Sequence, residues 1–383
     1  MKKIYLLLAC AMCATMTFAQ DEAAAEAPAS PWKVSGVVGL NANATGLWNW
    51  AAGGNNAVAG VTFGKLRLVY AENALSWESN LDIEYGLSWI DQKYDKLQKT
   101  SDHLKFDTKF GWEFAPTWFL TASAAFQTQM ALGRAYSGDD GYDPVNSAIL
   151  APSYTDISVG IDWKKSVNGA DFSLYLSPIA GRITTAYISD KWNKKYNDEY
   201  LAANPGVTDY DLRTNLQEAN GTWKYNDLNE KVYMNALAEL GLNFKGTINY
   251  SYKDFKLATS LTLFTPYKWD KQMMYQITNP DGESFNVTQT QLDKMEPLPG
   301  AVIDKLGFRD NNRRFGNFDV DWTVMVSYQF LKCLNVTLST NLKYINGLKI
   351  NKEYTKADGT TFTQAAERVQ FMGVLGLGIG YSF

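Results

Sequence analysis

An alternation of apolar and polar side chains with a period of two residues constrains this chain more than any other feature. Its clearest copy runs from Ala74 to Trp89, where one set of alternate positions is mainly apolar and aromatic and the other holds serine, asparagine and carboxylates. Successive side chains of a β-strand point to opposite faces, so this segment predicts a strand with one apolar and one charged face. A single strand of this kind would suit a soluble sandwich as well as a barrel.

The number of such segments favours a barrel over a sandwich. There are twelve, an even number, as a single-chain bacterial outer-membrane barrel requires. The sequence therefore predicts an all-β fold, a transmembrane antiparallel up-and-down β-barrel of about twelve strands. The predicted strands are 33–42, 57–70, 74–89, 104–114, 118–131, 156–164, 171–187, 239–250, 255–264, 318–330, 334–345 and 368–383.

The connections between these segments alternate strictly between long and short. This is the pattern of extended outer loops and tight periplasmic turns in an outer-membrane barrel, and it places both chain termini in the periplasm. A sandwich has no physical reason to alternate in this way. The long connections are predicted at 43–56, 90–102, 132–153, 188–236, 265–316 and 346–367.

The N-terminus predicts export. Two lysines precede an apolar stretch from Ile4 to Met16, and small-residue cleavage chemistry follows, which predicts a secretory signal peptide cut between Ala19 and Gln20. A lipoprotein cleavage box ending at Cys10 is the alternative. The predicted organisation is a signal peptide at 1–19, a mobile acidic leader at 20–31 and an outer-membrane β-barrel at 32–383.

Two further features indicate the outer membrane of a Gram-negative bacterium. Aromatic residues gather near both ends of the predicted strands, for example Trp118 beside a short turn and Trp89 beside a long loop, as interfacial girdles do. The final segment ends the chain on Phe383, which resembles the C-terminal signal of barrels that bacterial assembly machinery inserts. We therefore expect outer-membrane lipid and the barrel-assembly machinery as partners.

The charge and cysteine content exclude several classes of function. Without residues 1–19 the chain has 34 basic and 40 acidic residues, a balance that argues against nucleic acid as a partner. One cysteine remains, Cys333, so no internal disulfide can form. With one histidine and one cysteine we expect no metal site, and we expect no cofactor.

One predicted strand, 171–187, breaks the alternation. Its apolar positions are in phase up to Leu176, whereas Ile179 and Ile183 are shifted by one residue across Pro178. A one-residue slip turns every later side chain to the other face, and proline cannot donate a ladder hydrogen bond. We expect a β-bulge near Pro178 that restores the register, with two separate short strands as the alternative.

The charged face of the predicted strands supplies the candidate pore lining. Opposite charges interleaved around a barrel wall can pair across the lumen and narrow it, while paired carboxylates could instead act as in a glycosidase. A path that remains open would carry both signs with a modest acidic excess, which favours small polar or weakly cationic solutes. The predicted lumen-lining residues are Glu78, Asp82, Glu84, Lys105, Asp107, Lys109, Asp162, Arg182, Lys245, Asp319 and Asp321.

His103 is the candidate for enzymatic chemistry. It is expected at the loop end of the strand that begins with Leu104. A hydrolytic triad would have to use it, because the mature chain has no other histidine. The sequence places no serine beside it, so an interfacial polar residue is the simpler interpretation, and we expect no enzyme.

The two longest loops are candidate binding surfaces. Loop 188–236 holds tryptophan and tyrosine residues among charges, and such a set either grips a sugar or a partner surface or packs as a lid. They include Trp192, Tyr196, Tyr200, Tyr210, Trp223 and Tyr225. Asn279-Pro280-Asp281-Gly282 in loop 265–316 and Ala357-Asp358-Gly359-Thr360 in the last loop predict hairpin turns, which would let both loops extend as β-ribbons.

A short run near the N-terminus of the mature chain resembles a known family. The run Leu47-Trp48-Asn49-Trp50-Ala51-Ala52-Gly53-Gly54, preceded by Trp32-Lys33-Val34-Ser35-Gly36, resembles the signature of a Bacteroidota family classified as domain of unknown function 3078. The resemblance covers most of the mature chain and implies no activity. As a tight loop, the run would use Gly53 and Gly54 for positive φ angles and Trp50 as an anchor beside Asn49.

Together these features predict transport through a narrow or gated pore for small polar solutes. Twelve strands enclose more space than the side-chain-filled interior of a small barrel and less than a large porin. An alternative function is a surface-exposed binding or structural barrel that displays loops 188–236 and 265–316 to glycans or host proteins. A third is a membrane hydrolase that uses His103.

Overall fold

The computed structural model describes residues 30–45, 57–91, 96–136, 142–225, 231–268, 273–296, 299–308, 314–331, 334–346, 349–355 and 360–382. The predicted signal peptide, all but the last two residues of the predicted leader, and the signature residues Asn49, Trp50, Gly53 and Gly54 lie outside these ranges. The predicted division of the chain into three parts therefore stays a prediction.

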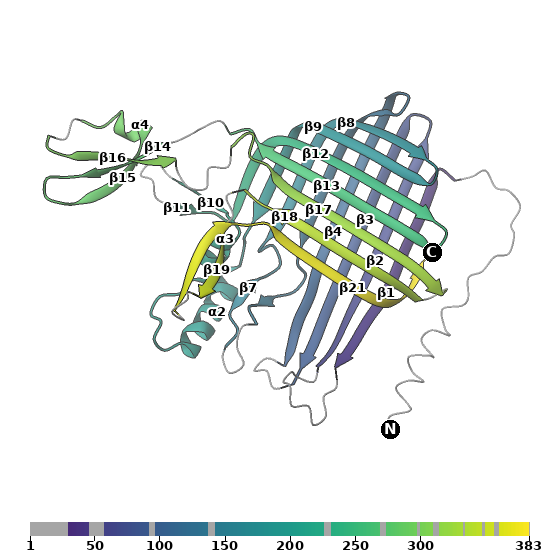
Figure 1. Cartoon of the computed structure of the whole chain (residues 1–383), viewed down its shortest axis with the longest axis horizontal. Helices are drawn as coiled ribbons and strands as arrows, with labels where there is room; N and C mark the ends of the chain where they lie inside the picture. The colour runs from purple at the N-terminus through teal and green to yellow at the C-terminus, as the bar shows by residue number, and fades with distance from the viewer. Residues whose placement is uncertain are drawn as a thin grey trace, which may run out of the picture.

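Twelve antiparallel strands form a closed barrel in which each strand pairs with the next barrel strand along the chain (Figure 1). Residues Val37–Asn41 of the first strand pair with Gly378–Ser382 of the last and close the ring. The up-and-down barrel predicted from the sequence is confirmed. Its strands are β1 (Trp32–Thr45), β2 (Ala57–Glu72), β3 (Leu75–Ile90), β4 (Leu97–Ala115), β5 (Trp118–Thr128), β8 (Ser153–Val167), β9 (Ala170–Thr185), β12 (Ala236–Tyr252), β13 (Phe255–Pro266), β17 (Asp319–Leu331), β18 (Leu334–Tyr344) and β21 (Gln370–Ser382).

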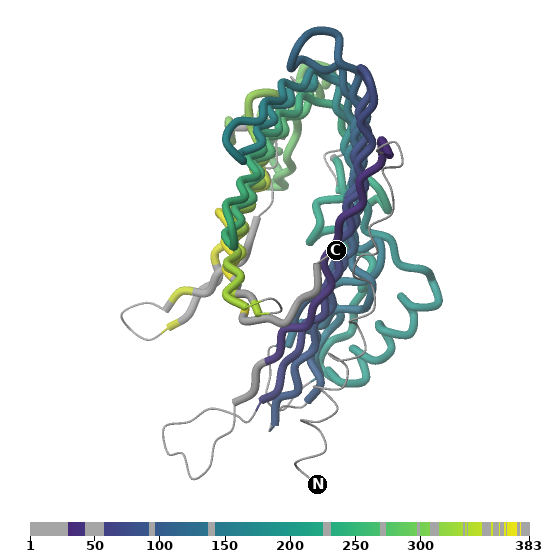
Figure 2. Tube along the Cα trace, turned by 90° about the vertical axis from the view of Figure 1, so that its right-hand side faces the viewer, coloured from purple at the N-terminus to yellow at the C-terminus, as the bar shows by residue number. Residues whose placement is uncertain are grey.

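The barrel is flattened rather than round. Figure 2 shows the Cα trace as an elongated ring, with the purple and blue N-terminal strands on one long side and the green and yellow C-terminal strands on the other. Opposite walls of such a ring lie closer together than those of a circular barrel with the same number of strands. Side chains from one wall can therefore contact the other.

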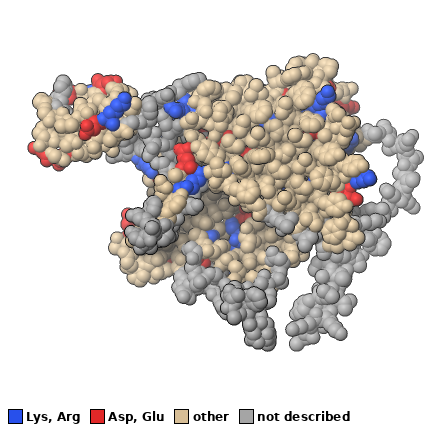
Figure 3. Space-filling view, viewed as in Figure 1, with Lys and Arg blue, Asp and Glu red and all other residues tan. Residues whose placement is uncertain are grey.

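The outer face of the wall is apolar. The apolar members of the alternation are exposed, among them Trp77 at 44%, Phe110 at 46% and Leu240 at 59%. Few charged side chains interrupt the barrel surface in the space-filling view (Figure 3). A continuous apolar surface of this extent is rare on soluble monomers and is the surface that a transmembrane barrel presents to lipid. Among the described residues, no helix is long and apolar enough to cross a membrane.

Short turns and long connections lie at opposite ends of the barrel, as predicted. The described short turns are two residues long and use left-handed backbone conformations, with φ of 51° at Asn73, 70° at Thr117 and 50° at Asn168. Hairpins of this length need positive φ because their twist must match that of the strands. The long connections carry the additional elements of the fold.

The predicted long connection 90–102 is wrong in its second half. Strand β4 already begins at Leu97, so His103 lies inside a strand and not at its loop end. Gly86 pairs with Ser101 and Leu87 pairs with Lys99, so Thr100 is an extra residue that forms a bulge. The bulge and the polar composition of this stretch hid the alternation from the sequence pattern.

The predicted bulge at Pro178 is confirmed. On one side Val159 and Ile161 pair with Ile179 and Leu176, and the register on the other side shifts at the same place. Leu176 and Ile179 are consequently both exposed on the outer face, which is the outcome that the change of phase predicted. The hydroxyl of buried Ser177 lies 2.8 Å from the carbonyl oxygens of both Val159 and Ile179.

Glycines on the strands beside the bulge make room for it. A methyl group on Gly160 of β8 would overlap the backbone of Leu176 and Ser177. A methyl group on Gly241 of β12 would likewise overlap the backbone of Thr265 and Pro266. The backbones therefore approach so closely here that only glycine fits.

We predict that Gly160→Ala destabilises the folded barrel by about 1–3 kcal/mol, since an added methyl group must push the strands apart. Gly181→Ala is the matched control, because a methyl group there would meet only the carbonyl oxygen of Ile157, at 3.9 Å. Urea unfolding followed by tryptophan fluorescence compares the two variants. Equal midpoints would show that the close packing at Gly160 is unimportant.

Three long connections fold into modules of their own. The connection after β5 holds the strand pair β6 (Gly133–Arg134) and β7 (Val145–Ser147), and the one after β9 holds α2 (Asp190–Ala203), α3 (Leu212–Ala219), β10 (Trp223–Tyr225) and β11 (Lys231–Tyr233). The connection after β13 holds β14 (Met273–Thr278), β15 (Ser284–Thr288), α4 (Gln289–Leu292) and β16 (Val302–Phe308). The helices of loop 188–236 were not expected from its sequence.

The hairpins predicted in the long loops are present. Strands β14 and β15 pair across residues 279–283, where the amide of Gly282 donates to the carbonyl of Asn279. Gly282 has φ of 84°, a conformation that glycine adopts without strain. Strands β19 (Lys349–Thr355) and β20 (Thr361–Glu367) form the second hairpin, and its predicted turn residues 357–359 lie outside the described residues.

Candidate functional site

The candidate site is the charged inner face of the barrel wall. Register places Lys65 of β2, Asp82 of β3 and Lys105 of β4 side by side on three successive strands. All three are polar members of the alternation, on the face opposite the exposed apolar side chains. Because several such rows meet inside a flattened ring, their partners come from both neighbouring and distant strands.

One network lies on the wall formed by β2, β3 and β4. Arg67 donates hydrogen bonds from Nε and Nη2 to the two carboxylate oxygens of Glu78, at 3.0 and 3.1 Å. Such a bidentate pair is stronger and more directional than a single contact. Asn80 donates to Glu78 at 3.2 Å and to Asp107 at 2.9 Å, so it joins the two carboxylates.

His103 belongs to the inner face and contacts an acid. Its Nε2 lies 3.3 Å from Asp82 Oδ1, and Lys65 Nζ lies 3.0 Å from Asp82 Oδ2. In a hydrolytic triad, one imidazole nitrogen faces the nucleophilic hydroxyl and the other faces the acid. The nearby Ser101 hydroxyl instead donates to Glu84. This arrangement is that of a charge cluster in the wall.

A second network ties three strands together around Asp162 of β8. The carboxylate of Asp162 is fully buried and lies 2.5 Å from Lys109 Nζ of β4 and 3.7 Å from Lys164 Nζ. Ser173 of β9 donates to it at 2.6 Å. The ammonium group of Lys109 also lies 5.0 Å above the ring of buried Tyr175. A buried carboxylate needs nearby cations and hydrogen-bond donors because it has lost its water.

A third network crosses the barrel near its loop end. Arg182 of β9 donates from Nε to Asp156 at 2.8 Å and from Nη1 to Asp319 of β17 at 3.0 Å. Its guanidinium lies 4.3 Å from the ring of Phe264. In the sheet, β12 and β13 separate β9 from β17, so the contact spans the curvature of the wall. On the same level, Lys343 of β18 lies 5.0 Å from the ring of Tyr154 on β8.

The structure thus brings most of the predicted lumen-lining charges together in pairs. Glu84 accepts from Ser101, and Asp321 accepts from Asn341 at 2.7 Å. Two predicted residues differ, because Lys105 and Lys245 make no hydrogen bond or ion pair with any described residue. That this pairing narrows the interior, and that each of these residues lines a solute path, both stay predictions.

We predict that Arg182→Met lowers the free energy of unfolding by about 1–3 kcal/mol, because it leaves Asp156 and Asp319 without their shared donor. Lys194→Met in α2 is the control, since the ion pair of Lys194 with Asp198 is highly exposed and contributes little to stability. Chemical unfolding of both variants tests this. A loss for Arg182→Met no larger than for the control would mean that the crossing pair contributes nothing.

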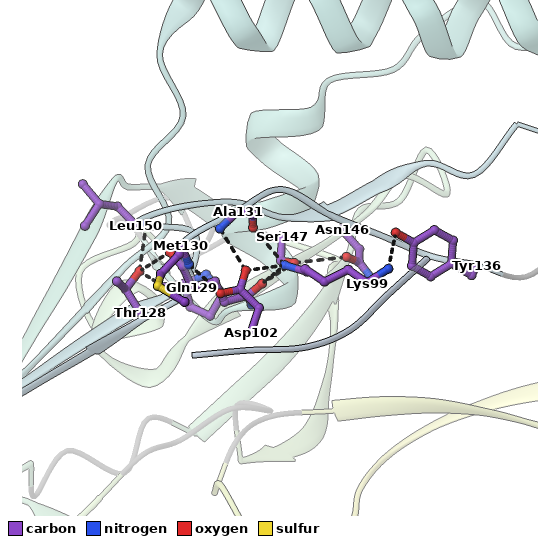
Figure 4. Close-up of polar contacts among 11 residues, drawn as sticks. Lys99, Asp102, Thr128, Gln129, Met130, Ala131, Tyr136, Asn146, Ser147 and Leu150 are labelled. Atoms are coloured by element: carbon purple, nitrogen blue, oxygen red, sulfur yellow. Dashed lines mark hydrogen bonds and ion pairs between the residues drawn. The ribbon is translucent and has the colours of Figure 1, made fainter. Parts of the chain in front are cut away.

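Sequence reasoning missed a polar cluster at the loop end of β4 (Figure 4). Asp102, 1% exposed, accepts hydrogen bonds at 2.8 Å from the amides of Met130 and Ala131 and from Lys99 Nζ. Lys99 also donates to Gln129 and to the carbonyl of Ala131. Residues three apart in a regular strand point to opposite faces, and only the bulge at Thr100 puts Lys99 and Asp102 on one face. The cluster fastens the segment after β5 to the barrel.

The aromatic loop 188–236 folds around a small core. Apolar side chains from α2, α3 and the β6–β7 connection pack together, which explains why these short helices are stable in the protein. Tyr200 and Tyr210 stack at 3.7 Å, and Trp192 stacks on Tyr196 while remaining 46% exposed. The buried members of this core are Val145, Ala148, Ala151, Ile188, Tyr196, Leu212 and Leu216.

Asp211 holds the two helices of this module together. It is the N-cap of α3 and accepts hydrogen bonds from the amide and hydroxyl of Thr214, while Asn193 of α2 donates to it at 2.8 Å. Burial alone would raise the pKa of Asp211, but the donors Thr214, Asn193 and Asn197 outweigh it and hold the pKa below its ordinary value of 3.8. The ionised form is therefore the stabilising one.

We predict that Asp211→Ala weakens the α2–α3 module by about 1 kcal/mol at neutral pH. The lowered pKa means that the stabilisation is complete above the ordinary value of 3.8 and is lost as the pH falls through the folded-state pKa. Amide hydrogen-exchange protection of residues 190–219 measures both effects, with the exposed Asp198→Ala as control. Protection that is the same in Asp211→Ala and the control at neutral pH would contradict the prediction.

The fold and inner face define the class of protein: a closed, twelve-stranded, antiparallel transmembrane β-barrel with a charged interior. The family model described as "Protein of unknown function (DUF3078)" matches residues 42–133. This match includes the signature run and extends past the end of β5, and it covers less of the chain than the resemblance implied. A comparison with curated proteins gives no match.

Several solved barrel structures are similar to this chain at low identity. An outer membrane channel from Pseudomonas putida F1 has 11% identity and a TM-score of 0.33, over 95% of this chain and 100% of that one. The translocator domain of the autotransporter NalP from Neisseria meningitidis has 8% identity and a TM-score of 0.31, over 100% and 96%. The Pseudomonas putida toluene transporter TodX has 11% identity and a TM-score of 0.27, over 93% and 89%. Likenesses this distant cannot transfer a function.

Proposed function

We propose that the protein is an outer-membrane barrel that forms a narrow pore for small polar solutes. The observation that carries this proposal is a closed twelve-stranded wall whose outer face is apolar and whose inner face is charged. An interior that only filled a structural barrel could be apolar, as in small barrels whose side chains close the lumen. Charged side chains are costly to bury and usually mark a route for polar solutes or ions across a membrane.

The crossing ion pairs support a narrow pore rather than a wide one. Lys109–Asp162 and Arg182–Asp319 each join strands that are not neighbours in the sheet, and they lie at different heights along the barrel. A solute would have to pass beside them or compete for their charges. Selectivity would then depend on charge and hydrogen bonding more than on size alone.

The outer membrane is the proposed location. The predicted signal peptide at 1–19 and the separation of long and short connections support it. Insertion would require the barrel-assembly machinery. The long connections would face outward and the two-residue turns would face the periplasm.

We predict that the purified protein forms small, stepwise conductances in a planar lipid bilayer. Deleting residues 190–219 should leave these steps present, because the pore belongs to the barrel and not to the helical module. The unfolded protein under the same conditions is the control for detergent artefacts. A silent bilayer with both the intact and the trimmed protein would refute the pore.

A binding function is the second candidate, and the folded core of the α2–α3 module favours it. A loop that only connects strands has no need of a core, whereas a module that presents exposed Trp192 beside Lys195 has the amphipathic surface that binds glycans. Glycan binding that disappears with residues 190–219, together with absence of conductance, would select this candidate.

A further inference from the structure

Two lysines of the inner face stand apart from the networks of ion pairs. Lys245 is at mid-height on β12, where its neighbours across the strands are Tyr175 and Thr262, neither of them acidic. Lys105 on β4 lies between Asp82 and Gln127, and Asp82 is already occupied by Lys65 and His103. Both lysines are half-buried, and neither has a hydrogen-bond or ion-pair partner among the described residues.

These two lysines belong to the same region of the interior. Lys109 extends from β4 to lie over Tyr175, which is the direct strand neighbour of Lys245. The charged groups that act on the ammonium of Lys245 are Lys105, Asp107, Lys109 and Glu78, all of them on β3 and β4. Lys245 on β12 therefore faces the wall that carries Lys105, and the two walls approach each other here.

The carboxylates of this region are already engaged. Asp162 is shared by Lys109, Lys164 and Ser173, and Glu78 is held by both arms of Arg67. Asp107 accepts from Asn80. Arg67, Lys109 and Lys164 each have an ion-pair partner among these carboxylates, whereas Lys105 and Lys245 have none among the described residues.

An uncompensated cation in a confined interior is costly, and a bound anion removes that cost. We propose that Lys105 and Lys245 bind the anionic group of a solute, a carboxylate or a phosphate, inside the barrel. Each ammonium group supplies up to three donors to such an oxyanion. The acidic excess of the sequence lies elsewhere: Asp156 and Asp319 share Arg182 at the loop end, so they do not offset the lysines.

This inference rests on the proposed pore and names its substrate class. It replaces the preference for weakly cationic solutes that the overall acidic balance suggested. The charges that a solute passes at close range matter more than the sum over the wall, because the Coulomb energy falls as the distance grows. The pair on β4 and β12 would therefore determine selectivity.

The test combines direct binding with conductance. Calorimetric titration of the detergent-solubilised wild-type protein with inorganic phosphate should show binding, and the Lys105→Gln/Lys245→Gln variant should bind about tenfold more weakly or not at all. In planar bilayers, the reversal potential under a KCl gradient should show chloride preference in the wild type. The double variant should lose that preference, and phosphate should no longer block its current.

Two control variants make the result specific. Lys105→Arg/Lys245→Arg retains both charges and should keep phosphate binding, which separates charge from a packing effect. Lys194→Gln removes one positive charge from the highly exposed surface of α2 and should change nothing. Heat-dependent mobility of all variants on denaturing gels shows that each is folded.

The outcomes separate the binding site from the pore. Phosphate binding that depends on the two lysines, without conductance, would refute the pore and retain the site. Conductance without phosphate binding, or with cation preference in the wild type, would overturn the anion site and retain the pore. Binding that persists in the double variant would be an adventitious ion only and would also overturn the site.

Discussion

Closure of the strand ladder is the physical constraint on which the rest of this structure depends. A backbone N–H or C=O group in hydrocarbon has no water to bond, and each one left unpaired costs several kcal/mol. A chain that crosses lipid with strands must therefore return its last strand to its first. The pairing of β1 with β21 does this here, although it joins only five residues on each strand. Every inward or outward orientation along the wall follows from that ring.

Closure also determines what happens to the polar side chains. Pleating turns one set of alternate residues of every strand toward the interior, so the charges of different strands share one confined space. Lys109 and Arg182 bridge strands that are not neighbours, and their carboxylate partners neutralise most of that charge. The charge that these pairs do not neutralise is local. It consists of a cationic region at mid-height and of carboxylates nearer the loops. In the proposed pore, this residual charge would govern which solutes pass.

Local patterns predicted the elements that local physics controls. The number of strands, the bulge at Pro178 and the hairpin at Asn279–Gly282 each follow from a few consecutive residues, and all three are present. The sequence pattern did not predict the early start of β4, because the bulge at Thr100 depends on pairing with β3. The sequence pattern did not predict helices α2 and α3, because their stability comes from a core whose other residues lie far away in the chain.

The sequence by itself determined which side chains are candidates for the interior, because a period of two residues is a property of the strand alone. Only the tertiary structure decided their partners. Whether Asp162 binds Lys109, and whether Lys245 has a carboxylate within reach, depends on how closely opposite walls of a flattened ring approach. Contacts between distant strands have no local signature. The paired charges and the two lysines without partners in the described part of the chain therefore became distinguishable only once the barrel was closed.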